Sequence, residues 1–355
     1  MPDAFLLSRA LLQFQSNDDD LLRQLSAVVR TPDGHLWVGS DEYLTVERLS
    51  PLGDGRYGDH KTFHLKEYLT LADDESEIDI EGLAYADGYL WVVGSHSLKR
   101  KKPKGKKTEK DIARLATIKR DNNRYLLARL PLCSGDIVAS LPRGAATLTA
   151  ASLPMTEDQH SLMAALQTDE HLGPFLQRGL PSKDNGFDIE GIAISGNRIF
   201  LGLRGPVLGG WAILLEVAVH PTATDGTLTL QPLDKEHGTV YRKHFLNLNG
   251  LGIRDLCCHG EDLLILAGPT MALFGPMQVF RLGNLPAHQD TLWHQDTDPL
   301  EALFDLPFMP GADNAEGLTL LPCLGFEAAL MVVYDAPHPG RLVDKGIWAD
   351  IFKLP

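Results

Sequence analysis

Two segments of the chain repeat one pattern: DIEGLAYADGYLWVVGSHS at residues 79–97 and DIEGIAISGNRIFLGLRGP at residues 188–206. Each begins with Asp-Ile-Glu-Gly, continues as an apolar run, turns at a glycine-containing pair such as Asp87-Gly88, and returns as a second apolar run. Two apolar runs joined by such a turn are typical of a β-hairpin with both strands buried. The repeat therefore predicts a protein built from similar hairpins.

Weaker copies of the pattern begin at Leu25, Gly252 and Asn314. The equivalent positions in the five copies are Ser26, Glu81, Glu190, Arg254 and Glu316. They are separated by 55, 109, 64 and 62 residues, and by 65 residues from the last copy through both chain ends to the first. A period of this length fits the four-stranded blade of a β-propeller. We predict an all-β fold, a single β-propeller over residues 1–355 with about five blades.

The 109-residue interval is nearly twice 55, which leaves six blades as the alternative count. However, Met155–Leu176 has the pattern of a helix, because Thr156 and Gln159 form a capping box before an apolar face and Pro174 disfavours continuation. We therefore expect a helical insertion near residues 155–176, within an excursion over residues 133–187.

Further apolar runs complete the predicted blades. Ala113–Lys119 is expected to be the third strand of the second blade. Gly346–Leu354 and Ala4–Phe14 are expected to pair in the last blade, so that the two chain ends close the ring and leave no open edge.

The composition limits the partners. Forty-seven acidic and 33 basic residues give a net charge of −14, which argues against binding of nucleic acid or a membrane by the whole surface. The segment 98–110 is the exception, with eight basic residues and one acid. It predicts a solvated loop, or alternatively an electrostatic tether for phosphate, nucleic acid or the acidic rim. The four cysteines form no CxxC motif, which favours a reducing, cytoplasmic location. The oligomeric state stays open.

A hairpin brings the start of its first strand and the end of its second strand to the same end. In a propeller, these ends meet at one rim around the axis. The residues that we expect there are Asp79, Glu81, His96, Asp188, Glu190, Arg204, Arg254 and Glu316. Function is therefore expected at this rim.

Glutamates that converge on one axis need a cation, an arginine or bound protons. Carboxylate oxygens suit Ca²⁺, Mg²⁺ or Mn²⁺, so the candidate metal ligands are Glu81, Glu190, Glu316, Asp79 and Asp188. Arg204 and Arg254 are expected either to pair with the glutamates or to hold an anionic ligand, and His96 is the candidate general base. In the structural alternative, the Glu-Gly glycine permits close packing of blades and the glutamate caps backbone amides.

The segments Asp79–Ala84, Gly94–Ser97, Asp188–Ala193, Arg204–Pro206 and Glu316-Gly317 resemble a family of uncharacterised bacterial proteins known only as a domain of unknown function. That family is similar, more distantly, to phytase-like esterases and to calcium-dependent lactonases of the gluconolactonase class. The lactonases hold a divalent metal with a Glu, an Asn and an Asp at the channel mouth. Only the Glu-Gly element carries over, onto Glu81, Glu190 and Glu316.

Two functions follow as hypotheses. In the first, the protein is a metal-assisted hydrolase of a phosphate ester or lactone at the channel mouth. In the second, it is a non-enzymatic scaffold whose rim binds a small anionic ligand or a protein.

Overall fold

The computed structural model describes residues 4–15, 20–155, 161–224, 226–234, 238–283, 290–295, 299–307 and 309–355. This part of the chain is mostly β-strand with few helices, which confirms the predicted all-β class. Within it, no helix is long and apolar enough to cross a membrane. The predicted capping residues Thr156 and Gln159 lie outside the described residues.

The strands form antiparallel groups that follow one another along the chain. The first group contains β2 (Leu25–Arg30), β3 (Leu36–Ser40), β4 (Thr45–Gly53) and β5 (Arg56–His64). The second contains β6 (Ile80–Ala86), β7 (Tyr89–Gly94) and β10 (Leu127–Cys133), with β11 (Asp136–Ile137) and β14 (Ala151–Ser152) paired to β10. The third contains β15 (Asp188–Ser195), β16 (Arg198–Gly205), β17 (Ala212–Val217), β20 (Tyr241–Leu246) and β24 (Thr291–Trp293).

The remaining groups complete the order. The fourth contains β21 (Gly252–His259), β22 (Asp262–Gly268), β23 (Gln278–Leu282) and β25 (Leu300–Asp305). The last contains β26 (Asn314–Leu320), β27 (Ala329–Asp335), β29 (Gly346–Lys353) and β1 (Leu6–Gln13), with β28 (Leu342–Val343) paired to β29. Separate two-stranded hairpins are β8 (Lys99–Arg100) with β9 (Ile118–Lys119), β12 (Ser140–Arg143) with β13 (Ala146–Thr149), and β18 (Val219–Pro221) with β19 (Leu228–Leu230).

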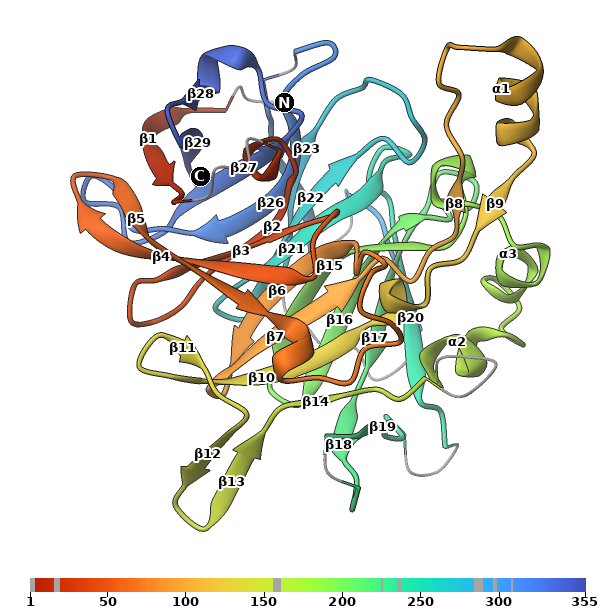
Figure 1. The fold of residues 1–355 in the computed structure, drawn as a ribbon, viewed down its shortest axis with the longest axis horizontal. Coiled ribbons are helices and arrows are strands. Elements are labelled where there is room, and N and C mark those ends of the chain that lie inside the picture. Colours follow the sequence, from red (N-terminus) through yellow and green to blue (C-terminus); the bar gives the residue numbers. More distant parts are fainter. Residues whose placement is uncertain are drawn as a thin grey trace.

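The first strand of each group lies at the centre of the molecule (Figure 1). These strands contact one another in the closed circuit β2, β6, β15, β21, β26 and back to β2. Neighbouring groups also share buried apolar clusters, such as the one that joins Trp37 of β3 to Leu83 of β6. Because burial of apolar area is the main stabilising term in folding, these clusters hold the groups around a common axis.

Strands from the two chain ends lie side by side. β1 pairs antiparallel with β29, with Ala10 opposite Ala349. On its other edge β1 pairs in parallel with β5 through Leu11 and Leu12. The parallel pair is short, and it joins the last group to the first in one nine-stranded sheet.

The structure corrects two local predictions. Ala113–Lys119 is not the third strand of the second group; that strand is β10, and residues 113–119 belong to helix α1 (Thr108–Leu115) and to β9. The apolar side chains Leu115 and Ile118 of this segment are exposed, so the apolar run that suggested a strand of a blade belongs to an exposed arm instead. The basic segment 98–110 accordingly contains β8 and the start of α1 as well as loop.

The helical insertion contains two short helices, α2 (Ser161–Leu166) and α3 (Gly173–Arg178), where the sequence suggested one. Pro174 does not end a helix but lies in the first turn of α3. Proline is well tolerated there because the first amides of a helix have no partner within it. α3 ends at Gly179, whose φ of 60° suits glycine as a C-terminal residue.

Candidate functional site

Each central strand carries a β-bulge at the position that the repeat alignment made equivalent. In β6, for example, Ile80 pairs with Gly94 and Gly82 with Val93, so Glu81 is the extra residue. The register shifts in the same way in the other four central strands, and the extra residues are Ser26, Glu190, Arg254 and Glu316. A bulge re-aims a side chain and often lies beside a functional site. The same local backbone feature, the bulge, therefore sets the direction of all five side chains.

The glycine after each glutamate permits close packing of the central strands. A Cβ on Gly191 would lie 2.9 Å from the Cα of Asp255 in β21, and a Cβ on Gly82 would lie 3.0 Å from the backbone nitrogen of Ile192 in β15. These contacts are with backbone atoms, which cannot rotate away. The Glu-Gly pair thus combines a packing residue with a residue placed by the bulge.

Buried arginines neutralise part of the acidic rim. Glu190 accepts from Arg204 Nη1 at 2.6 Å and pairs with Arg254 Nη1 at 2.9 Å, and the side chains of all three are more than nine-tenths buried. Arg254 also pairs through Nη2 with Glu316. Arg254 thereby joins carboxylates from the two strands that flank its own.

A third arginine belongs to the same cluster. Arg124, in the 3₁₀ turn η3 (Asn122–Tyr125), pairs with Asp79 and donates to Ser97 Oγ at 3.2 Å. The sequence offered no signal for it, because it lies in an irregular segment outside the repeated hairpins.

Glu81 differs from the other two glutamates of the bulge positions. In the part of the chain that the structure describes, its carboxyl has no hydrogen bond or ion pair. Burial and the neighbouring carboxyls of Asp79 and Glu190 hold the pKa of Glu81 well above its usual range. The side chain is nevertheless only partly buried, so solvent reaches it. Glu81 is thus the bulge glutamate that has no cationic partner among the described residues.

The surrounding carboxyls outnumber the arginines. Burial and the carboxyls of Asp79 and Asp335 raise the pKa of Asp41 to about 7. Burial and Glu190 raise the pKa of Asp188 to about 8, against the opposing effect of Arg204. The carboxyls that act on one another here are Asp41, Asp79, Glu81, Asp188, Glu190, Glu316 and Asp335, against the guanidiniums of Arg124, Arg204 and Arg254. We call these residues the acidic ring.

His96 lies close to the ring in the chain, but its side chain faces a different space. Its Nδ1 donates to the Gly94 carbonyl oxygen at 2.8 Å, and its backbone has a φ of 54°. Burial lowers the pKa of His96 to about 4, so the imidazole is neutral near pH 7. It lines a cavity of about 100 Å³ together with Tyr125 and with Phe175 of α3. A histidine of such low pKa is a weak general base at neutral pH.

The carboxylates of the acidic ring include the metal ligands predicted from the sequence. In the described residues, no three His, Cys, Asp or Glu side chains are arranged to hold a metal ion. Glu190, Glu316 and Asp79 are each bound by an arginine instead. A divalent cation would therefore have to displace arginines from these carboxylates.

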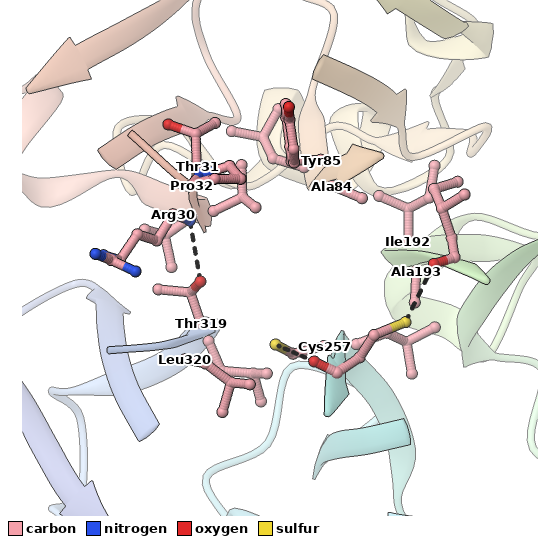
Figure 2. A pocket seen from close by; sticks show the side chains of 17 residues that line it. Arg30, Thr31, Pro32, Ala84, Tyr85, Ile192, Ala193, Cys257, Thr319 and Leu320 are labelled. Carbon is pink, nitrogen blue, oxygen red and sulfur yellow. Dashed lines mark hydrogen bonds between the residues drawn. The ribbon is translucent and has the colours of Figure 1, made fainter. Parts of the chain in front are cut away.

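The other end of the axis has a different character. There the central strands surround a cavity of about 280 Å³, whose lining includes Val28, Leu83, Ile192, Leu256 and Leu318. Figure 2 shows Ala84, Ala193, Cys257 and Thr319 around its open centre, with the guanidinium of Arg30 pointing away. Each strand contributes equivalent positions, two to four residues after its bulge. The axis is thus charged at one end and mostly apolar at the other.

Residues 24–350 match the model of a protein family of unknown function, DUF3616. The chain belongs to this family. The match confirms the resemblance to a domain of unknown function and spans all five central strands. No curated protein matches the sequence.

Solved structures of β-propeller-like proteins are similar to this family member at low identity. The PQQ-bound aldose sugar dehydrogenase from Streptomyces coelicolor is 11% identical, with 98% of this chain and 99% of that chain covered and a TM-score of 0.38. A catalytically inactive virginiamycin B lyase from Staphylococcus aureus, with quinupristin, is 10% identical, with 98% and 100% covered and a TM-score of 0.35.

Proposed function

We propose that the acidic ring is the functional site and that it binds a small organic cation, an ammonium or guanidinium group, at Glu81. One observation carries this proposal. Among the glutamates at the bulges, Glu190 and Glu316 share the guanidinium of Arg254, whereas Glu81 has no cationic partner in the described residues. A carboxyl that lies beside other carboxyls without a cationic partner gains more from an added positive charge than one already paired with an arginine.

The ring itself contains an example of the proposed interaction. Arg254 lies between two carboxylates, and a ligand cation would stand in the same relation to Glu81. Ser26, beside Glu81 in the circuit of strands, is the smallest of the five bulge residues, and its hydroxyl donates to the Ile80 carbonyl. The bulge position next to Glu81 on this side therefore carries no basic side chain, unlike Arg254 beside Glu190 and Glu316.

The hydrolase predicted from the sequence is the second candidate. It requires a divalent cation, with Glu81, Glu190, Glu316, Asp79 and Asp188 as ligands, and these side chains would have to leave their arginines. The excess of carboxyls over guanidiniums at the ring favours a cation of either kind. Arg204 and Arg254 would hold an anionic substrate only after releasing Glu190.

We also infer five blades for the propeller. The closed circuit of five central strands, each followed by its own antiparallel group, supports this count over six. The joined nine-stranded sheet then contains the first blade and the last.

The decisive experiment compares cations by thermal shift and calorimetry. Agmatine and butylamine should raise the melting temperature of the wild-type protein in a concentration-dependent way, whereas butanol should not. Burial and the neighbouring carboxyls raise the pKa of Glu81, and a bound cation should lower it, so binding should release protons and the binding enthalpy should depend on the buffer.

Variants assign the effect to one residue. Glu81→Gln should abolish both the shift and the proton release, while Glu301→Gln, at an exposed acid of β25, should keep them. Amine binding that survives Glu81→Gln would overturn the proposal. A rise in melting temperature with Ca²⁺ or Mn²⁺ but not with the amines would reject the organic-cation proposal in favour of a divalent-ion site.

A further inference from the structure

An arm projects from the second strand group between β7 and η3. It consists of β8, the basic loop, α1 and β9, and Figure 1 shows α1 at the upper right, away from the sheets. The base of the arm is fixed to the body, because Lys99 pairs with Glu77 and Arg100 Nη2 contacts Asp184 at 2.6 Å. The arm is therefore a defined element with a fixed attachment.

The helix of this arm lies on the surface. None of the residues of α1 is buried, although the helix has one apolar side. Ile112 and Leu115 are 63% and 48% exposed, and Ile118 just after them is 43% exposed. Residues three apart lie on the same face of a helix, so Ile112 and Leu115 form one apolar patch at the tip of the arm.

Lysines without acidic partners surround this patch. In the described part of the chain, no ion pair involves Lys101, Lys102, Lys104, Lys106, Lys107 or Lys110. The loop that carries them is held in shape, because Asp111 accepts from the amides of Lys104 and Gly105, and Arg114 Nε donates to the Lys102 carbonyl. The backbone that carries these lysines is therefore held in place by Asp111 and Arg114.

We propose that the arm docks the protein on an anionic lipid surface. Lysines next to exposed aliphatic side chains are the chemistry of a segment that binds acidic headgroups and inserts its apolar side into the interface. The segment 98–110 carries +7 in a chain of −14, so the remainder carries −21. The same membrane charge that attracts the arm repels the body and orients the molecule with the arm toward the lipid.

Nucleic acid is the other polyanion to consider. Phosphates would engage the lysines, but they offer nothing to Ile112, Leu115 and Ile118. The exposed aliphatic residues therefore favour lipid, and they supply the variant that separates the two partners.

Vesicle sedimentation tests the proposal with the full chain. The wild-type protein should sediment with phosphatidylcholine vesicles that contain about one third phosphatidylserine, but not with phosphatidylcholine alone, and added salt should release it. A variant with four lysines changed to Gln should show a vesicle partition coefficient at least about tenfold lower than the wild type. The four are Lys102, Lys104, Lys106 and Lys107. Ile112→Ser with Leu115→Ser should also weaken binding, at unchanged melting temperature because both side chains are exposed.

A matched control uses exposed apolar residues elsewhere. Leu273→Ser with Phe274→Ser removes side chains that are 62% and 66% exposed, and it should leave vesicle binding unchanged. The proposal fails if the wild-type protein does not sediment with the anionic vesicles at low salt. It also fails if vesicle binding is unchanged by the Ile112 and Leu115 substitutions and a DNA or RNA oligonucleotide competes with the vesicles. That result is expected if the lysines of the arm bind nucleic acid.

Discussion

Arg254 joins Glu190 on one side to Glu316 on the other, with Nη1 2.9 Å from Glu190 Oε2 and Nη2 against Glu316 Oε1. The three residues come from three successive central strands, so one guanidinium ties β15, β21 and β26 together at the axis. A buried arginine in this position is needed chiefly because of the charges that it neutralises.

Removing Arg254 should lower the stability of the protein, and the size of the loss should depend on whether its carboxylate partners are still present. Arg254→Met leaves Glu316 without its arginine and Glu190 with Arg204 alone, and it should lower the free energy of unfolding by about 3–5 kcal/mol. Adding Glu190→Gln and Glu316→Gln should recover much of that loss. Denaturant unfolding of the single and triple variants measures both, with Arg281→Met at an exposed pair as the control, where we expect less than about 1 kcal/mol. A triple variant no more stable than Arg254→Met would contradict this account.

The glycine contact between central strands gives a second prediction. Gly191→Ala places a methyl group 2.9 Å from backbone atoms of Asp255 and Leu256, and it should destabilise the protein by about 1–3 kcal/mol. Gly283→Ala is the matched control, because its Cβ would come no closer than 3.4 Å to any neighbour. Equal melting temperatures for the two variants would show that the central strands can separate at little cost.

Asp41 predicts how stability varies with pH. Its pKa rises from the usual 3.8 to about 7, so in this window the folded protein holds a proton that the unfolded chain releases. The free energy of unfolding should therefore fall as the pH rises from about 4 to about 7, and Asp41→Asn should remove this part of the decline. Asp73→Asn should act in the opposite direction, because the hydrogen bonds from Ser76 lower the pKa of Asp73. Thermal unfolding across this range measures both; parallel curves for wild type and Asp41→Asn would refute the assignment.

His96 should remain neutral over most of the physiological range. Burial lowers its pKa to about 4, from a usual value of 6.5, so its contribution to stability is complete above pH 6.5 and is lost as the pH falls toward 4. NMR should show imidazole resonances of His96, assigned with His96→Gln, that do not shift between pH 8 and about pH 5. Resonances that titrate near pH 6.5 would contradict this expectation and would favour His96 as the general base predicted from the sequence.

Much of the architecture was predictable because the hairpins are encoded locally. The apolar runs and turns between residues 79 and 97 are adjacent in sequence, and the alignment of Glu81, Glu190 and Glu316 anticipated positions that share one bulge. The proximity of these residues at the axis then follows from repetition alone.

Other features depend on contacts that sequence patterns do not encode. Arg124 joins the acidic ring from an irregular turn, where its guanidinium pairs with Asp79. The apolar residues of α1 and β9 resemble those of a buried strand, although α1 has no buried residue. The sequence pattern alone therefore predicted residues 113–119 as a strand of a blade. The role of Pro174 likewise depended on whether a helix ended or began at that point.

The pairing of β1 with both β29 and β5 has a consequence for folding during synthesis. During translation β1 leaves the ribosome long before its antiparallel partner β29 exists, and until then it has only the short parallel contact with β5. The earlier groups can assemble while synthesis continues, but the seam between the two termini closes only after release of the C-terminal strand. A nascent chain stalled before Gly346 should therefore expose the edges of both β1 and β27, the two strands that β29 separates.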